Sequence, residues 1–236
     1  MAIRQLEEIR IPSKNLEETK SWYENHFQIS ANQFQPNEVK FSFSKGAKLV
    51  FYKSEEEHAY PFSPINLNVY DPQNLHRDLF LKGCKLTDIT DFYDMLSYEV
   101  TDPNELQIGI VGWEGGLEAA SFMHLGGYFL PVQNLERAYQ WYKDHLGAIE
   151  LNSFTFPTPM YGELRAITLD HLQITLVEIP TDLFTQMNHP FTLGSNNIQE
   201  DYQTLKDAGI AVEEFENGES FHFIDGEGHK VRVQLV

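Results

Sequence analysis

Apolar and charged residues alternate in LEEIRIP, from residue 6 to residue 12. Ile9 and Ile11 fall on one face, and the charged Glu8 and Arg10 fall on the other. This period of two is typical of a half-buried strand. The sequence therefore predicts a strand that buries its isoleucines and turns Glu8 and Arg10 to the opposite side.

The pattern then changes to that of a helix. Asn15 stands three residues before Glu18, which resembles a capping box at a helix start. The helix it predicts carries Leu16, Trp22, Tyr23 and Phe27. The rest of this half predicts a hairpin, a strand, a second helix and further strands: VKFSFS (39–44), KLVFYK (48–53), INLNVY (65–70), a helix after Asp71-Pro72 ending at Gly83, KLTDIT (85–90), YEVTD (98–102) and LQIGIV (106–111).

The second half predicts the same order of elements. Its first strand is SFMHLGGYFLPV (121–132), Asn134 starts a helix that ends at Gly147, and Asn197 with Glu200 forms another capping box before a helix ending at Gly209. The other predicted strands are ELRAITL (163–169), LQITLVEI (172–179), FTLGS (191–195), FHFID (221–225) and KVRVQLV (230–236).

Identities at one spacing show that the second half repeats the first. Seven residues recur 119 positions later: Pro12, Asn15, Leu16, Glu17, Trp22, Tyr23 and His26 match Pro131, Asn134, Leu135, Glu136, Trp141, Tyr142 and His145. An internal repeat indicates two copies of one domain. We expect an α+β chain with domains at 1–112 and 122–236, joined by a Gly-rich linker at 113–121. The repeated Trp-Tyr pairs are at helical spacing and are expected in the core.

Composition narrows the class of protein. No apolar run approaches the ~20 residues that a membrane helix needs, and the N-terminus lacks a signal-peptide hydrophobic region. A single cysteine, Cys84, agrees with a reducing compartment, so we expect a cytoplasmic protein. The formal net charge of −18 repels phosphate backbones, and we therefore expect neither nucleic acid nor a membrane as partner.

Familiar catalytic motifs are missing from the sequence. HExxH, paired CxxC, GxSxG and GxxxxGK[ST] do not occur, which argues against the common zinc protease, hydrolase and P-loop classes. The histidines are each expected to be surface or structural residues.

Four segments carry a resemblance to a known superfamily. They are IPSKNLEETKSWYENHF (11–27), FLPVQNLERAYQWYKDHLG (129–147), DPNELQIGIV (102–111) and FIDGEGHKVRVQLV (223–236). Together they resemble the vicinal oxygen chelate superfamily, which includes glyoxalases, bleomycin-resistance proteins and extradiol dioxygenases. The resemblance implies two tandem glyoxalase-like domains, each of paired βαβββ modules whose mixed sheets curl into cups.

The resemblance also implies where a divalent metal would be held. Metal-using members place His, Gln or Glu on the first strand of each module and Glu on the last. In this sequence those positions fall on Glu8, Pro64 and Gln107 or Gly109 in the first half. In the second half they fall on Gly127, Pro190 and Arg232, and the inner hairpin positions fall near Val50 and Thr175. Arginine cannot ligate a cation, so no metal cofactor is expected.

Strand parity predicts what lines the cups instead. Glu8, Arg10, Asn66, Asn68 and Gln107 face inward in the first half, and Phe129, Thr192 and Arg232 do so in the second. Several polar groups on one concave face suggest a solvated binding cleft. The alternative is that Glu8 and Arg10, or Arg232 with an acid, form structural ion pairs.

Two functions follow from these observations. The first is a small-molecule binder without a metal, acting by sequestration or metal-independent chemistry. The second is a lyase, isomerase or ring-cleaving dioxygenase using a divalent metal such as Ni, Zn, Mn or Fe, with Glu8, His189 and Glu178 as the ligands to test. A third option makes one cup a scaffold only. We expect a monomer, because the tandem copies can pair within one chain.

Overall fold

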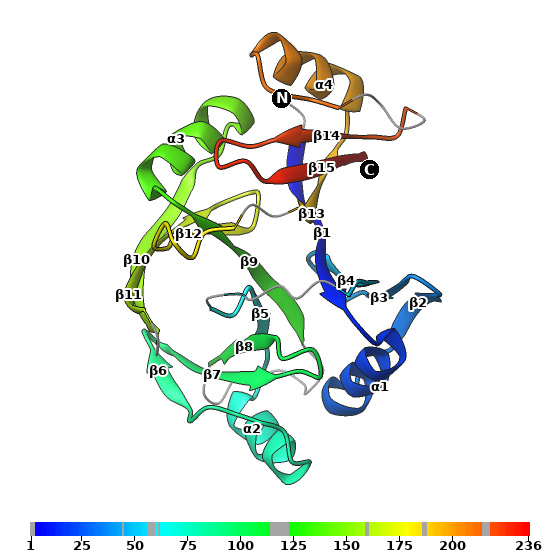
Figure 1. The fold of residues 1–236 in the computed structure, drawn as a ribbon. Coiled ribbons are helices and arrows are strands. Elements are labelled where there is room, and N and C mark those ends of the chain that lie inside the picture. The colour runs from blue at the N-terminus through cyan, green and yellow to red at the C-terminus, as the bar shows by residue number, and fades with distance from the viewer. Residues whose placement is uncertain are drawn as a thin grey trace. The chain divides into compact units, whose positions relative to one another are not determined.

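The computed structural model describes residues 3–43, 45–55, 60, 62–113, 123–158, 161–185, 188–213 and 218–236. The chain forms two compact units (Figure 1). Unit 1 joins Met1–Arg10 to Tyr128–Val236, and unit 2 is Ile11–Gly127. The sequence repeat divides the chain differently, and residues 114–121 of its linker lie outside the described residues. Each unit is described by itself.

Unit 1 contains two mixed sheets and two helices. One sheet has the strand order β14-β15-β13-β1, and the other has the order β10-β11-β12-β9. The strands are β1 (Ile3–Ser13), β9 (His124–Val132), β10 (Glu150–Thr158), β11 (Gly162–Leu169), β12 (Ile174–Glu178), β13 (Asn188–Ser195), β14 (Ser220–Ile224) and β15 (Lys230–Leu235). β13 and β15 are parallel, whereas β1 is antiparallel to β13. The unit boundaries fall inside β1 and β9, whose other ends belong to unit 2.

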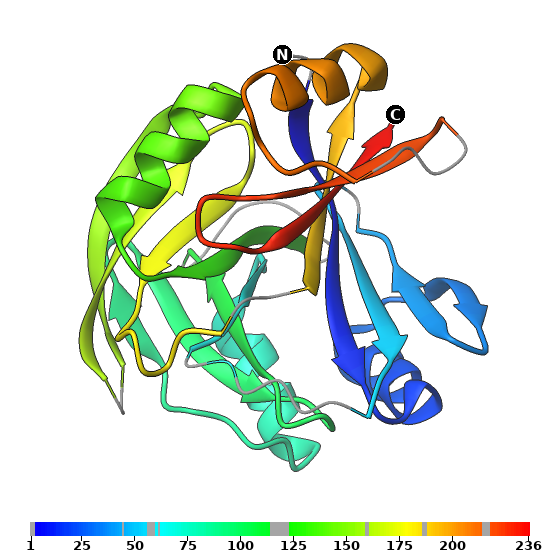
Figure 2. The same cartoon turned by 45° about the horizontal axis from the view of Figure 1, so that its top comes forward.

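The helices of unit 1 cover one face of its strands. α3 (Leu135–Leu146) packs against β11 and β12, and α4 (Ile198–Asp207) packs against β15 (Figure 2). Aromatic contacts fix both helices. Trp141 of α3 stacks on Phe223 with ring centroids 5.9 Å apart, and Tyr202 of α4 meets Phe221 edge-on at 5.4 Å. Phe221 and Phe223 are fully buried, so this face of β14 belongs to the core.

Unit 2 has the same kinds of elements. Its strands β4-β3-β2 form one antiparallel group, and β5-β8-β7-β6 form a mixed group in which β5 and β8 are parallel. The elements are α1 (Leu16–Phe27), β2 (Ala31–Gln35), β3 (Glu38–Phe41), β4 (Lys48–Lys53), β5 (Ile65–Asn68), α2 (Pro72–Leu81), β6 (Thr90–Phe92), β7 (Met95–Thr101) and β8 (Gln107–Gly112). The predicted α+β class is confirmed.

The helix starts follow the cap residues with one exception. The Asn15 and Asn134 side-chain oxygens accept hydrogen bonds from the backbone N–H groups of Glu18 and Arg137, at 3.2 and 2.8 Å. Asn197 makes no such bond. Its amide donates instead to the Glu200 carboxylate at 2.6 Å, and its backbone N–H donates to Ser195, so neither bond of the predicted capping box is formed at α4.

A tyrosine–aspartate pair is repeated in the two units. In unit 2 the Tyr23 hydroxyl donates to Asp102 at 3.4 Å, and in unit 1 the Tyr142 hydroxyl donates to Asp225 at 2.8 Å. Both tyrosines are buried, as expected, whereas Trp22 and Trp141 of the repeated pairs are only half-buried. Each pair ties a helix to the turn before the last strand of a module. The repeated sequence therefore encodes a structural link.

Two strands were not predicted, and one prediction was largely wrong. β2 and β10 expose most of their residues, and their apolar alternation is confined to Phe154 and Phe156 of β10, which is too short to identify a strand. KLTDIT was predicted as a strand, but only an isolated bridge at Leu86 and the start of β6 at Thr90 are extended pairings there. Among the described residues, no helix is both long and apolar enough to cross a membrane.

Candidate functional site

A row of polar residues crosses the sheet of unit 1 from strand to strand. Glu8 of β1 lies opposite Thr192 of β13, Thr192 lies opposite Arg232 of β15, and Arg232 lies opposite His222 of β14. Residues that are direct partners on neighbouring strands share a face of the sheet, about 4.8 Å apart. We call Glu8, Thr192, Arg232 and His222 the unit 1 row.

The row lies on the sheet face opposite the helices. The neighbours of Arg232 in sequence, Val231 and Val233, are fully buried, as are Phe221 and Phe223 beside His222. Because side chains alternate along a strand, the row points away from this apolar face. Thr192 is fully buried and Arg232 is half-buried. The row is therefore a strip of polar groups in which the cationic side chain of Arg232 is partly exposed to solvent.

The charges beside the row are largely paired. The Arg10 guanidinium lies 3.5 Å from the Glu8 carboxylate. Lys230 lies 2.7 Å from Glu213, whose carboxylate is also 3.8 Å from the His222 ring. These pairs leave Arg232 as the row's cation with no carboxylate partner among the described residues. Its Nη2 donates to the Ser220 hydroxyl at 3.2 Å.

Two buried polar atoms of the row have no hydrogen-bond partner among the described residues. They are the Thr192 Oγ1 and the Arg232 Nε. A buried polar group without a partner costs about 1–3 kcal/mol. Such atoms are uncommon in folded proteins and require an explanation. The two atoms lie on neighbouring strands, so the described residues leave two polar groups of the row unsatisfied side by side.

The other predicted site residues do not belong to this row. In unit 2, Asn66 lies opposite Gly109, and a Cβ at Gly109 would collide with the Asn66 amide oxygen. The Asn68 amide lies 3.2 Å from the His124 Nε2. In unit 1, Phe129 lies opposite Thr175. Its ring meets the Phe156 ring edge-on, with ring centroids 6.4 Å apart. Glu8, Arg10, Thr192 and Arg232 come together, whereas Asn66, Asn68, Gln107 and Phe129 are not part of the row.

His124 of unit 2, like the other histidines, was expected to be a surface or structural residue. Its Nδ1 is buried with no partner among the described residues. Burial, followed by the nearby Lys45, lowers the pKa of this imidazole. His124 is therefore neutral at pH 7. Strand alternation from Gly126 could have placed it on the same face as Asn68.

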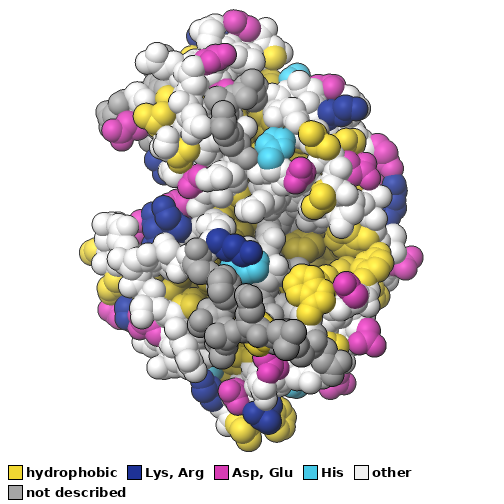
Figure 3. Space-filling view, turned by 180° about the vertical axis from the view of Figure 1, so that it is seen from behind, with side chains coloured by type: hydrophobic (Ala, Val, Ile, Leu, Met, Phe, Trp, Pro, Cys, Tyr) yellow, Lys and Arg dark blue, Asp and Glu magenta, His cyan; other side chains and the backbone are white. Residues whose placement is uncertain are grey.

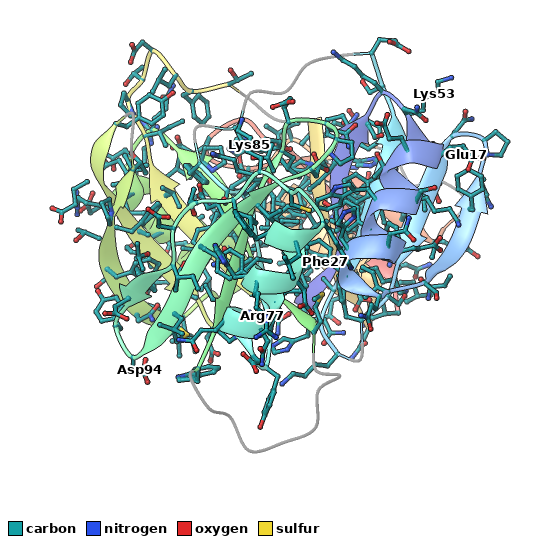
Figure 4. The ribbon with its side chains drawn as sticks, turned by 90° about the horizontal axis from the view of Figure 1, so that it is seen from below. Glu17, Phe27, Lys53, Arg77, Lys85 and Asp94 are labelled. Atoms are coloured by element: carbon teal, nitrogen blue, oxygen red, sulfur yellow. The ribbon has the colours of Figure 1, made fainter. Side chains whose placement is uncertain are left out.

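Gln107 lines a cavity of unit 2. The cavity has a volume of about 600 Å³ and lies at the N-terminal end of α1, where Lys14, Glu18, Lys85 and Glu105 also line it. In Figure 4, Glu17 marks this end of α1, near Lys53, and Phe27 marks the other end. The lining charges of both signs are exposed, so the cavity wall is largely solvated.

The residues of the unit 1 row offer few ligands to a divalent cation. They supply one carboxylate, Glu8, and one imidazole, His222, while the cationic Arg232 stands in the same row. Glu178 is engaged by Arg165 at 3.1 Å, and the His189 side chain lies outside the described residues. Within the described part of the chain, no three His, Cys, Asp or Glu side chains gather as metal ligands would.

Acidic side chains are spread over the surface. In Figure 3 they are distributed across the face in view, with basic side chains between them, and the described ones gather in no single cluster. The charge of −18 thus acts as a general field over the surface, which favours solubility.

Comparisons with known proteins give the fold. A mutant glyoxalase I from Zea mays matches with a TM-score of 0.74 and 15% identity, over 98% of this chain and 94% of that chain. A putative dioxygenase from Bacillus subtilis matches with a TM-score of 0.72 and 12% identity, over 99% of this chain and 85% of that chain. The cppA protein from Streptococcus pneumoniae matches with a TM-score of 0.62 and 11% identity, over 100% of this chain and 99% of that chain. No protein-family model matches the sequence, and no curated protein matches it significantly.

Proposed function

We propose that this chain, which has the two-domain fold of the vicinal oxygen chelate superfamily, binds a small molecule at the unit 1 row without the superfamily's metal. Binding would serve sequestration or metal-independent chemistry. Because fold does not carry function, the proposal rests on the residues of the row.

Arg232 is the observation that carries this proposal. It occupies the position at which the resemblance implies a carboxylate metal ligand. A guanidinium has five N–H donors and no acceptor, and it stays charged at every physiological pH. A cation placed beside it would meet like charge in a partly dehydrated place, where repulsion is weakly screened. The same side chain suits a polar ligand.

The alternative is a divalent-metal lyase, isomerase or ring-cleaving dioxygenase. Glu8 favours it, because its buried carboxylate occupies a position where the resemblance implies a metal ligand. The two functions differ in one measurable quantity, the metal that the purified protein retains.

Metal content therefore tests the proposal. Untagged protein is incubated with Ni, Zn, Mn, Fe and Co, dialysed exhaustively and analysed by plasma mass spectrometry, beside Glu8→Ala and the exposed control Glu105→Ala. We expect far less than one equivalent of each metal in all three proteins. One equivalent that is lost in Glu8→Ala and kept in Glu105→Ala would replace our proposal with the metal-dependent alternative.

We propose further that the chain acts as a monomer. The pairing of β1 with β13 within unit 1 joins distant parts of one chain, which supports assembly without a second copy. Light scattering would contradict this proposal by showing a stable dimer.

A further inference from the structure

We infer that the unit 1 row binds the oxyanion of a small organic acid, with Arg232 and Thr192 as the donors. This inference rests on the proposed function, because it names the class of ligand for the same row. It is carried by the two buried atoms without partners and by the local balance of charge.

Arg232 provides the charge. Its Nη2 is engaged by the Ser220 hydroxyl, and its Nε is buried with no acceptor among the described residues. Nε and Nη2 lie on the same edge of the guanidinium, the edge that accepts both oxygens of a carboxylate in bidentate pairs. Nη2 has a second hydrogen besides the one given to Ser220. The edge thus offers at least its Nε–H to an oxygen of the ligand.

Thr192 provides a second donor. Its Cα is the direct partner of the Arg232 Cα on the neighbouring strand, so the two side chains leave the sheet on the same face. Thr192 is fully buried, and its hydroxyl has no partner among the described residues. A hydroxyl that donates to a charged oxygen forms a stronger hydrogen bond than one between neutral groups.

The acids near the row are already compensated. Arg10 lies beside Glu8, and Lys230 lies beside Glu213. An incoming anion therefore meets the uncompensated charge of Arg232 rather than a net negative surface. In a chain of formal charge −18, such a locally positive place is what an anionic ligand requires.

An isosteric series of probes tests the sign of the ligand's charge. Benzoate, benzamide and benzamidine share one ring and one planar three-atom group, with charges of −1, 0 and +1. Phenyl phosphate distinguishes a phosphate ligand from a carboxylate ligand. Each probe is titrated at constant ionic strength into the full chain, and backbone amide shifts of β13 and β15 are followed by NMR.

Four variants locate the binding. We expect Arg232→Gln to weaken benzoate binding about tenfold or more, the loss typical of a hydrogen bond to a charged group. Thr192→Val keeps the shape and should weaken it several-fold, while Arg232→Lys keeps the charge and should retain part of it. Arg77→Gln removes an exposed arginine of unit 2 and should change nothing. The folding of each variant is checked by its amide spectrum.

The outcomes distinguish failure of the oxyanion inference from failure of the proposed function. Benzoate or phenyl phosphate shifting β13 and β15, with benzamide and benzamidine at least tenfold weaker, is the expected result. Benzamide or benzamidine binding there equally well would overturn the oxyanion inference and leave the proposed function standing. Benzoate binding that survives Arg232→Gln, or no shift with either anion, would also overturn it. Retained metal would instead contradict the proposed function itself.

Discussion

At Thr192 the chain keeps a hydroxyl in a place where a methyl group would cost less. The Oγ1 is buried and has no partner among the described residues, and such a group lowers the free energy of unfolding by about 1–3 kcal/mol. Binding sites commonly retain this kind of local cost, because the group is satisfied only when the ligand is present.

Thr192→Val should therefore raise the stability of the ligand-free protein by about 1 kcal/mol, because the shape is kept and an unpaired group is removed. Urea unfolding measures the change. The matched control is Thr175→Val, also buried in unit 1, whose hydroxyl is bonded to Thr168 at 3.1 Å. That control should lose about 1 kcal/mol. A loss of similar size in both variants would contradict the role given to Thr192.

Asp225 should make the free energy of unfolding depend on pH in a known direction. Burial raises the pKa of its carboxyl, against the opposing effects of His229 and the Tyr142 hydroxyl. The folded chain therefore holds this proton more tightly than the unfolded chain. The resulting stability is complete below the unfolded pKa of about 3.9 and is lost as pH rises through the folded value.

Wild type should thus lose stability relative to Asp225→Asn as the pH rises from below about 4 through the folded pKa of Asp225. Urea unfolding of both proteins across this range measures the difference. Asp102→Asn should show the same sign, since burial also raises the pKa of Asp102. A difference that grows in favour of wild type with rising pH would show that both carboxyls are instead stabilised in their charged forms.

Among the elements, helix caps that look alike in sequence act differently. Asn134 accepts a hydrogen bond from the first turn of α3, whereas Asn197 accepts none from α4 and donates to Glu200. Ser195 takes over part of the role, because its hydroxyl accepts from the Asn197 N–H at 3.1 Å and donates to the buried Asp201.

Asn134→Ala should therefore cost about 1 kcal/mol of stability, as loss of a cap does. Asn197→Ala should cost less than half of that, because no cap bond is lost. Chemical denaturation of the two variants under the same conditions gives the comparison. Equal losses would show that Asn197 caps α4 in solution.

Sequence patterns predicted the elements well where one face is buried. LEEIRIP became β1, and the strands and helices bearing apolar alternation were recovered. β2 and β10 were missed because most of their residues are exposed and leave only a short hydrophobic signal. The tandem fold followed from motifs that the whole-chain matches confirm.

The candidate site was predicted only in its parts. Parity turned Glu8, Thr192 and Arg232 to the polar side of their strands, but it assigned Glu8 and Thr192 to different halves. The structure makes them direct partners. A repeat says which segments are alike and does not say which strands pair, because pairing depends on contacts between residues far apart in sequence.

For the molecule as a whole, the first strand is a structural part of unit 1. Ile3, Leu6 and Ile9 of β1 are buried, and burying three such side chains contributes about 5–9 kcal/mol. This is comparable to the whole stability of a typical domain. β13 would present an open edge without β1, and open edges promote aggregation.

A chain lacking residues 1–10 should therefore aggregate or fail to fold. A synthetic peptide of residues 1–13, added during refolding, should restore a soluble species with native circular dichroism. A scrambled peptide of the same composition is the control. If the shortened chain folds by itself to a stable monomer, β1 is dispensable and this account of unit 1 is wrong.

The same pairing has a consequence for the order of events during synthesis. Glu8 leaves the ribosome 184 residues before its partner on β13, residue 192. At about 5–20 residues per second, β1 waits roughly 10–40 s for that partner. Throughout this interval the β1 segment of the nascent chain has no β13 strand to pair with, and its three core side chains cannot be buried against that strand. Unit 1 can be completed only after β13 has left the ribosome, and β1 depends on protection until then.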